Sequence, residues 1–166
     1  VMAPQTHLDG VTFWDTDIPP FSFAWDLAPD HALMLAIFAA IEDGTFGSLN
    51  PKRLYATGIS SGGYMTSRMA VSYPGKFKAL AIQSASYATC PVGPLCLPPA
   101  PPKDHPPTLF LAGLLDPLVP LWTVQAYYNR LVAKGIKTQL IVDALASHQW
   151  IPAAPSAVVD WFLASP

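Results

Sequence analysis

Four short apolar runs in this chain alternate with stretches that carry apolar residues at helical spacing. The runs cover residues 54–59, 77–85, 108–114 and 137–144. Short runs that are almost wholly apolar are typical of strands buried on both faces of a sheet. Strands separated by helices at this spacing predict a mainly parallel sheet flanked by helices on both faces, so the predicted fold class is α/β.

The other predicted elements follow from residues that start and stop helices. Asp30 can cap a helix, which carries apolar residues at helical spacing and ends at Gly44. The segment 1–4 is interpreted as the end of a further buried strand. Three more helices are predicted, over residues 62–73, 121–135 and 156–164.

The length of 166 residues suits one domain with its own hydrophobic core. There is no internal repeat and no linker, so residues 1–166 are predicted to form a single domain. Eight of the 19 prolines lie between Cys90 and Pro107. This segment, about residues 87–107, is interpreted as an inserted loop, because each flank alone is too small for a separate domain.

Charge and hydropathy exclude several classes of protein. The net charge is −2, whereas a nucleic-acid partner would require a basic surface. No apolar run reaches the roughly 18 residues of a membrane-spanning helix. With 51% hydrophobic residues the chain is too apolar to be disordered. We therefore expect neither a nucleic-acid partner nor a membrane span, and the oligomeric state is not indicated.

The two cysteines lie in one loop, CPVGPLC, at Cys90 and Cys96. A disulfide between them is predicted, which favours an oxidising compartment and hence a secreted or periplasmic protein. The alternative is a pair of free thiols in a cytosolic protein. Two thiols without a suitably spaced histidine pair cannot form a four-ligand zinc site.

A candidate catalytic motif follows the first internal strand. Residues 58–62 read GISSG, a G-x-S-x-G pattern between a predicted strand and a predicted helix. This context is typical of the nucleophile elbow, a sharp turn that lifts the central serine above the sheet. The N-terminus of the following helix directs N–H groups and a positive dipole toward charge that develops beside that serine.

Steric crowding favours Ser60 over Ser61 as the nucleophile. Residues two positions before and after the nucleophile must be small, and around Ser60 these are Gly58 and Gly62. Around Ser61 they would include the β-branched Ile59. Ser61 is then expected to contribute its backbone N–H to the oxyanion hole.

A serine nucleophile requires a base that is itself oriented by an acid. Asp116 and His148 follow later predicted strands, at the edge where an open parallel sheet places its site. Asp116 can alternatively be a turn residue and His148 a surface histidine, and Asp143 is a rival acid at a strand end. Three other histidines compete less well, namely His7, His31 and His105, of which His105 is kept as a substrate-side candidate.

Aromatic residues occur close to these motifs in the sequence. Tyr64 follows the candidate elbow, Trp122 follows Asp116, and Trp150 follows His148. They are candidate substrate-binding residues that could hold an apolar acyl group, although core packing is the alternative for each. Trp161 fits a core position in the last helix.

Three stretches carry a resemblance to a known superfamily. They are RLYATGISSGGYMTSRMAVSYPGKFKALAIQSASYATC around the nucleophile, PTLFLAGLLDPLVP around the acid, and SHQW around the base. With them the chain resembles the α/β-hydrolase superfamily over roughly residues 50–166. More narrowly, it resembles secreted polyhydroxyalkanoate depolymerases and feruloyl-esterase-like serine esterases. The resemblance implies an exposed site that hydrolyses esters or polyesters with no metal or organic cofactor.

The chain departs from that pattern at two points. Ser147 stands before the base, where the group often has glycine. Members of the group also carry further strands before the segment that matches Val1, and these strands supply a second oxyanion-hole donor. The chain is therefore expected to be N-terminally shortened, a mature or trimmed product. Two alternatives follow: either an N-terminal portion precedes Val1 and supplies the donor, or the chain is a minimal variant that takes another donor, for which the 5–9 loop is the candidate.

The predicted function is a serine carboxylic ester hydrolase that acts on hydroxyacid polyesters through an acyl-enzyme, with synthetic polyesters as a further candidate substrate. One alternative is a prolyl-oligopeptidase-like peptidase or an acyltransferase, because the D-P-x-V-P motif also occurs in such enzymes. The other is a catalytically silent binding module, because the loop with the second oxyanion donor is not evident.

Overall fold

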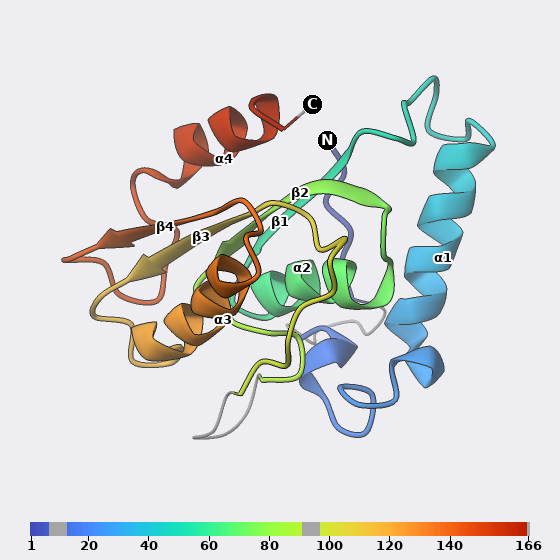
Figure 1. Cartoon of the computed structure of the whole chain (residues 1–166). Coiled ribbons are helices and arrows are strands. Elements are labelled where there is room, and N and C mark those ends of the chain that lie inside the picture. The colour runs from blue at the N-terminus through green and yellow to red at the C-terminus, as the bar shows by residue number, and fades with distance from the viewer. Residues whose placement is uncertain (7–12, 91–96, 166) are drawn as a thin grey trace.

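The computed structural model describes residues 1–6, 13–90 and 97–165. Its centre is a four-stranded sheet in which all neighbouring strands are parallel, in the order β1-β2-β3-β4 (Figure 1). The strands are β1 (Leu54–Ile59), β2 (Phe77–Gln83), β3 (Thr108–Gly113) and β4 (Thr138–Asp143). The predicted α/β class and parallel sheet are confirmed.

Helices cover both faces of the sheet, with α2 and α3 on one face and α4 on the other (Figure 1). The helices are α1 (Pro29–Glu42), α2 (Ser61–Ser72), α3 (Leu121–Ala133) and α4 (Ala154–Leu163). Two short 3₁₀ helices precede α1, namely η1 (Asp15–Asp17) and η2 (Trp25–Leu27). None of the described helices is long and apolar enough to cross a membrane.

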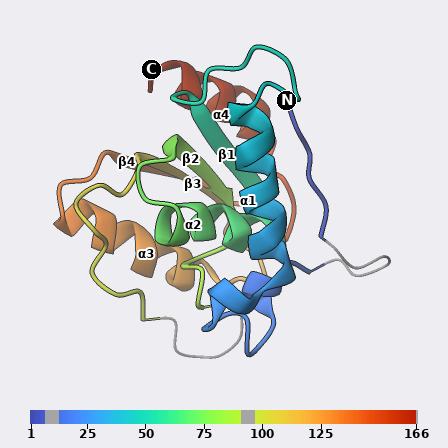
Figure 2. The same ribbon diagram turned by 90° about the vertical axis from the view of Figure 1, so that its right-hand side faces the viewer.

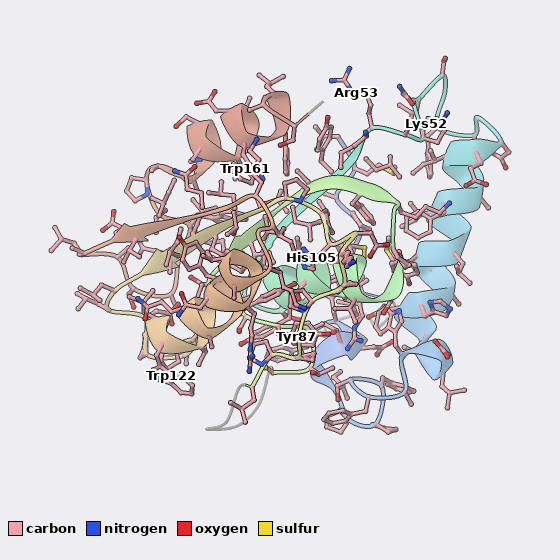
Figure 3. All side chains as sticks on the ribbon, in the orientation of Figure 1. Lys52, Arg53, Tyr87, His105, Trp122 and Trp161 are labelled. Carbon is pink, nitrogen blue, oxygen red and sulfur yellow. The ribbon has the colours of Figure 1, made fainter. Side chains whose placement is uncertain are left out.

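The core forms because alternate residues of the central strands point to opposite faces. In β2, Leu80 and Ile82 face the α1, α2 and α3 side, while Ala79 and Ala81 face α4. The four side chains are fully buried. On the α4 side Trp161 packs against the sheet, so its predicted core role is confirmed (Figure 3).

The segment that precedes α1 is held against α2 by a buried arginine. The Arg68 guanidinium donates to the Thr16 hydroxyl at 3.0 Å and to the Ser22 carbonyl at 2.8 Å. Figure 2, seen from the side of α1, shows this helix in front of β1 and α2. The segment around η1 therefore packs against α2, including its first residue, Ser61.

Two local predictions are wrong. Residues 1–4 form no strand and are exposed. Asp30 is not the cap of α1, since the N-cap is Ala28 and makes no side-chain cap bond. The carboxylate that accepts the Asp30 N–H, at 2.9 Å, belongs to Asp15, and no local pattern predicts this contact.

Candidate active site

Ser60 occupies a strained turn between β1 and α2. Its φ of 55° and ψ of −124° lie in a region that residues with a Cβ rarely adopt. The strain is supported by two backbone hydrogen bonds, since the Ser60 N–H donates to Gln83 O at 3.1 Å and Tyr64 N–H donates to Ser60 O at 2.9 Å. The backbone therefore has the conformation expected of a nucleophile elbow.

Glycine is required on both sides of this turn, but not at both of the predicted positions. A Cβ on Gly58 would lie 2.3 Å from the carbonyl oxygen of Gly62. The crowding predicted for a Cβ at Gly62 is wrong, because it would meet nothing within 4 Å. The crowded neighbour is Gly63, whose Cβ would lie 2.6 Å from the Cβ of Ala85. Gly62 instead presents its backbone to Gly58.

Asp116 and His148 form a direct pair after β3 and β4. The His148 Nδ1 lies 2.8 Å from Asp116 Oδ2, while Asp116 Oδ1 accepts the N–H groups of Leu118 and Val119, each at 2.9 Å. Burial by itself would raise the pKa of Asp116, but the Val119 N–H, the His148 ring and the Leu118 N–H together hold it below its usual value. Asp116 is thereby kept ionised beside the imidazole.

A close backbone approach brings His148 within reach of Asp116. A Cβ on Gly113, the last residue of β3, would lie 2.3 Å from the Ala146 carbonyl oxygen and 2.5 Å from that of Ser147. Only glycine fits there, so the loop that precedes His148 can pass directly over the end of β3.

The rival acid Asp143 binds backbone N–H groups of the turn after β4. Its Oδ1 accepts the N–H groups of Leu145 at 2.8 Å and Ala146 at 2.9 Å, so the carboxylate supports the turn after β4. The carboxylate in contact with the histidine is Asp116.

Ser60 lies at the same edge of the sheet as the Asp116–His148 pair, because β1, β3 and β4 run parallel. Within the described residues no hydrogen bond joins the Ser60 hydroxyl to His148. Catalytic hydrogen bonds are often long in the absence of substrate and shorten when it binds.

A second carboxyl group lies beside the elbow and was not predicted from the sequence. The Ser61 hydroxyl donates to Asp17 Oδ2 and accepts the Trp14 N–H at 2.8 Å. Burial raises the pKa of Asp17 to about 7, although the Ser61 hydrogen bond and the Arg68 charge lower it. Asp17 and Ser61 are far apart in the chain, and no local motif marked the contact.

The three aromatic candidates have different surroundings. Tyr64 is buried in the core between α2 and α3, where burial and the charge of Asp17 raise its pKa to about 12. Trp122 is exposed at the start of α3 and points outward (Figure 3). Trp150 is half-exposed and lines a shallow apolar groove of about 250 Å³ with Thr57 and residues of α4. Tyr64 therefore has little surface to offer a ligand.

Solved structures with a similar fold include hydrolases and esterases. A putative dienelactone hydrolase from Klebsiella pneumoniae subsp. pneumoniae matches with a TM-score of 0.61 and 22% identity, over 87% of this chain and 66% of that one. Esterase PE8 matches with a TM-score of 0.59 and 21% identity, over 78% of this chain and 59% of that one. The chain has the α/β-hydrolase fold.

This α/β-hydrolase chain is more similar in sequence to a curated relative than to those two solved structures. It is 53% identical over 167 aligned residues to a poly(3-hydroxyoctanoate) depolymerase from Pseudomonas fluorescens. The match covers 100% of this chain and 59% of the relative, so the chain spans less than two thirds of that protein's length. No family model matches. The resemblance to polyhydroxyalkanoate depolymerases is confirmed, whereas that to feruloyl esterases stays a prediction.

Two of the other histidines, which were weighed against His148 as the base, make contacts elsewhere in this α/β-hydrolase fold. His105 is buried with its Nε2 2.6 Å from the Tyr127 hydroxyl, which makes it unsuitable as a substrate-side residue. Burial lowers the pKa of His105. His31 stacks on Tyr73 within the α1–α2 contact, and His7 lies outside the described residues.

The predicted disulfide falls partly outside the described chain. Cys90 is disulfide-bonded and no described cysteine is free. Cys96 lies outside the described residues, so its pairing with Cys90 stays a prediction. The described residues contain no group of three or more His, Cys, Asp or Glu side chains that could hold a metal ion.

Proposed function

We propose that the chain is the catalytic part of a serine carboxylic ester hydrolase that cleaves hydroxyacid polyesters. The observation that carries the proposal is the strained Ser60 turn at the same sheet edge as the Asp116–His148 pair. A serine in this backbone conformation, an imidazole, and a carboxylate bound to the imidazole are the parts that acyl transfer by a serine requires.

The roles follow from the contacts of each residue. The Ser60 hydroxyl attacks the ester carbonyl, and His148 Nε2 takes the hydroxyl proton and then delivers it to the leaving alcohol. Asp116 fixes the histidine tautomer with its proton on Nδ1 and stabilises the imidazolium. Water, deprotonated by His148, then attacks the acyl-enzyme, releases the acid and restores Ser60.

The oxyanion is stabilised by the beginning of α2. Ser61 is the first residue of that helix, so its backbone N–H has no partner within the helix. This N–H group and the helix dipole favour negative charge on the carbonyl oxygen. The predicted second donor stays a proposal for the 5–9 segment, of which residues 7–9 lie outside the described residues.

The similarity to a poly(3-hydroxyoctanoate) depolymerase supports an aliphatic hydroxyacid polyester as the substrate. Trp122 and Trp150 follow Asp116 and His148 in the sequence and are exposed, so they are proposed as substrate contacts, while Tyr64 is proposed as a buried support of the site. A secreted or periplasmic location fits a disulfide-bonded Cys90 and a polymer too large to enter a cell.

The test compares the chain with its Ser60→Ala and Ser61→Ala variants on a p-nitrophenyl ester. We expect Ser60→Ala to lose roughly 10⁴-fold or more in rate and to resist labelling by a fluorophosphonate. Ser61→Ala keeps its backbone N–H and should still be labelled. Full activity of Ser60→Ala would refute the proposal, and loss confined to Ser61→Ala would move the nucleophile by one residue. A folded wild-type chain that resists labelling would indicate a silent binding module.

A matched amide substrate separates esterase from peptidase activity. We expect turnover of the ester to exceed that of an amide with the same acyl group. Equal or faster cleavage of the amide would replace the esterase proposal by the peptidase alternative.

A further inference from the structure

A buried glutamine ends β2, the strand that lies between β1 and β3 (Figure 1). Gln83 is the last residue of β2, and its side chain is fully buried. Because side chains alternate along a strand, it points to the same face as Ala79 and Ala81, which pack in the apolar layer between the sheet and α4. Burial of an amide among apolar side chains is costly unless its polar atoms find partners, so hydrogen bonds must hold it there.

The Gln83 side chain joins β2 to the loop that carries His148. Its Oε1 accepts the Ile151 N–H at 3.3 Å, and its Nε2 donates to the Ser84 hydroxyl at 2.9 Å. Ile151 comes three residues after His148, and its carbonyl accepts the Ala154 N–H at 2.9 Å, where α4 begins. The buried amide therefore fixes the chain between the histidine and α4.

The main chain of Gln83 supports the elbow. Its carbonyl oxygen accepts the Ser60 N–H at 3.1 Å. A Cβ on Gly63 would lie 2.8 Å from the same oxygen, so the beginning of α2 passes directly against the end of β2. Gln83 thus contacts the backbone of the proposed nucleophile through its carbonyl and the loop of the proposed base through its amide.

The loop of His148 has a second attachment, on the other side of the histidine in the chain. The Leu115 N–H donates to Ala146 O at 3.0 Å, which ties the segment before His148 to the turn after β3. That bond sets the loop relative to β3, whereas the amide of Gln83 sets it relative to β2 and the elbow. The histidine is therefore held between two fixed points.

We propose that Gln83 is a positioning residue, whose buried amide holds His148 at the distance from Ser60 that proton transfer requires. The inference rests on the proposed function, because it concerns the same serine and the same base. Proton transfer tolerates little displacement of the base, and a misplacement of about 1 Å can cost on the order of a hundredfold in rate. Since Gln83 is fully buried, it acts through the loop and not by contact with a substrate.

The experiment compares two substitutions of Gln83 that differ in the acceptor atom. Gln83→Met keeps the volume but has no acceptor for the Ile151 N–H. Gln83→Glu keeps an oxygen in the place of Oε1 and can accept this N–H whether or not the carboxyl group is ionised. The matched control is Thr108→Val, which removes another fully buried donor, bound to Pro106 O at 2.9 Å at the beginning of β3.

We expect Gln83→Met to lower kcat on a p-nitrophenyl ester by roughly 10- to 100-fold and to leave KM within about threefold. Gln83→Glu should keep kcat within about fivefold of the unsubstituted chain, although its buried carboxyl group makes it the less stable of the two in urea. Thr108→Val should keep kcat within about twofold. Full kcat in Gln83→Met, or a ranking of kcat that follows the ranking of stability, would overturn the inference.

A double-mutant cycle tests whether the amide acts through the histidine. In a His148→Ala background the residual rate no longer depends on the imidazole, so adding Gln83→Met should cause less than about twofold further loss. The same loss in both backgrounds would assign Gln83 to the stability of the fold and overturn the inference.

The same cycle separates this inference from the proposed function. His148→Ala by itself should lose roughly 10³-fold or more if His148 is the base. Full activity of this single variant would refute the proposed function and the inference together. A large loss in His148→Ala beside an unaffected Gln83→Met would overturn the inference alone.

Amide hydrogen exchange provides a test that requires no variant to fold. The Ile151 N–H of the unsubstituted chain should be protected from exchange, because it is buried and bonded to Gln83 Oε1. The protection should fall by about tenfold or more in Gln83→Met and remain in Gln83→Glu. Rapid exchange of this N–H in the unsubstituted chain would contradict the contact on which the inference depends.

Discussion

Two carboxyl groups flank the elbow, and their surroundings change their pKa in opposite directions. Asp116 receives two backbone N–H groups and the His148 ring, which hold its pKa below the usual value. Asp17 is half-buried, but its Oδ1 is buried without a hydrogen-bond partner among the described atoms, and loss of solvent around the carboxyl group raises its pKa to about 7. Desolvation raises the pKa of both groups; three donors outweigh it at Asp116, whereas the Ser61 hydroxyl and the Arg68 charge do not outweigh it at Asp17.

This difference assigns different tasks to the two acids. In the proposed mechanism an imidazolium forms when Ser60 loses its proton, and a carboxylate that stays ionised, such as Asp116, can stabilise it. Asp17 contacts Ser61 instead of the histidine and is close to its own titration at neutral pH. It holds the N-terminal segment against the beginning of α2.

Replacing the histidine-bound acid should have the largest effect. We expect Asp116→Asn to lower kcat on a p-nitrophenyl ester by roughly 10³–10⁴-fold, because an amide cannot stabilise the imidazolium and favours the wrong tautomer. Asp143→Asn is the control at the end of β4, where an amide oxygen can still accept both N–H groups, and it should lose less than about tenfold. Equal losses would contradict the assignment of the acid.

The glycines of the elbow provide the next test, because they shape the backbone turn at Ser60. Gly58→Ala should destabilise the fold by about 3 kcal/mol or more, because its Cβ would lie 2.3 Å from a backbone oxygen. Gly62→Ala meets no atom within 4 Å and should change stability by less than about 1 kcal/mol. Urea unfolding of the two variants measures the contrast. Similar costs would show that the turn is not crowded as described.

Asp17 should make the protein less stable as the pH rises. Its folded pKa of about 7 exceeds the ordinary value of 3.8, so the folded state binds more protons between these limits. The free energy of unfolding should therefore fall across this window, by about 2–4 kcal/mol, and then become constant. We expect Asp17→Asn to lack this component when unfolding is measured at pH 5 and pH 8.

Asp116 and Asp17 change the free energy of unfolding in opposite directions as the pH rises. The lowered pKa of Asp116 contributes stability that is present above about pH 4 and is lost as the pH falls further. Asp116→Asn should therefore keep the difference between pH 5 and pH 8 that Asp17→Asn removes. An unchanged difference in Asp17→Asn would refute the raised pKa of Asp17.

The smallest effect is expected at Ser61. Ser61→Ala removes the hydroxyl that bridges Trp14 and Asp17 but keeps the backbone N–H that we propose for the oxyanion hole. We expect a loss of about 1–2 kcal/mol in the free energy of unfolding and less than about tenfold in kcat. A kcat loss comparable with that of Asp116→Asn would indicate that the hydroxyl itself acts on the substrate.

The sequence alone determined the parts of this protein that depend on neighbours in the chain. Short apolar strands and amphipathic helices predicted the parallel sheet, and glycines around two serines predicted the turn at Ser60. The turn depends on atoms only a few residues apart, such as Gly58 and Gly62, so its signal is local. Asp116 and His148 were predicted as partners from their positions after strands, because parallel strands end at one edge.

Only the tertiary structure decided which polar groups meet across long stretches of chain. Asp17 and Ser61 are 44 positions apart, and nothing in either segment predicts their contact. The burial of Tyr64 and His105 likewise depends on α3 packing over both. The physical reason is that burial and pKa are set by all atoms within a few ångströms, whereas sequence patterns report only residues near in the chain.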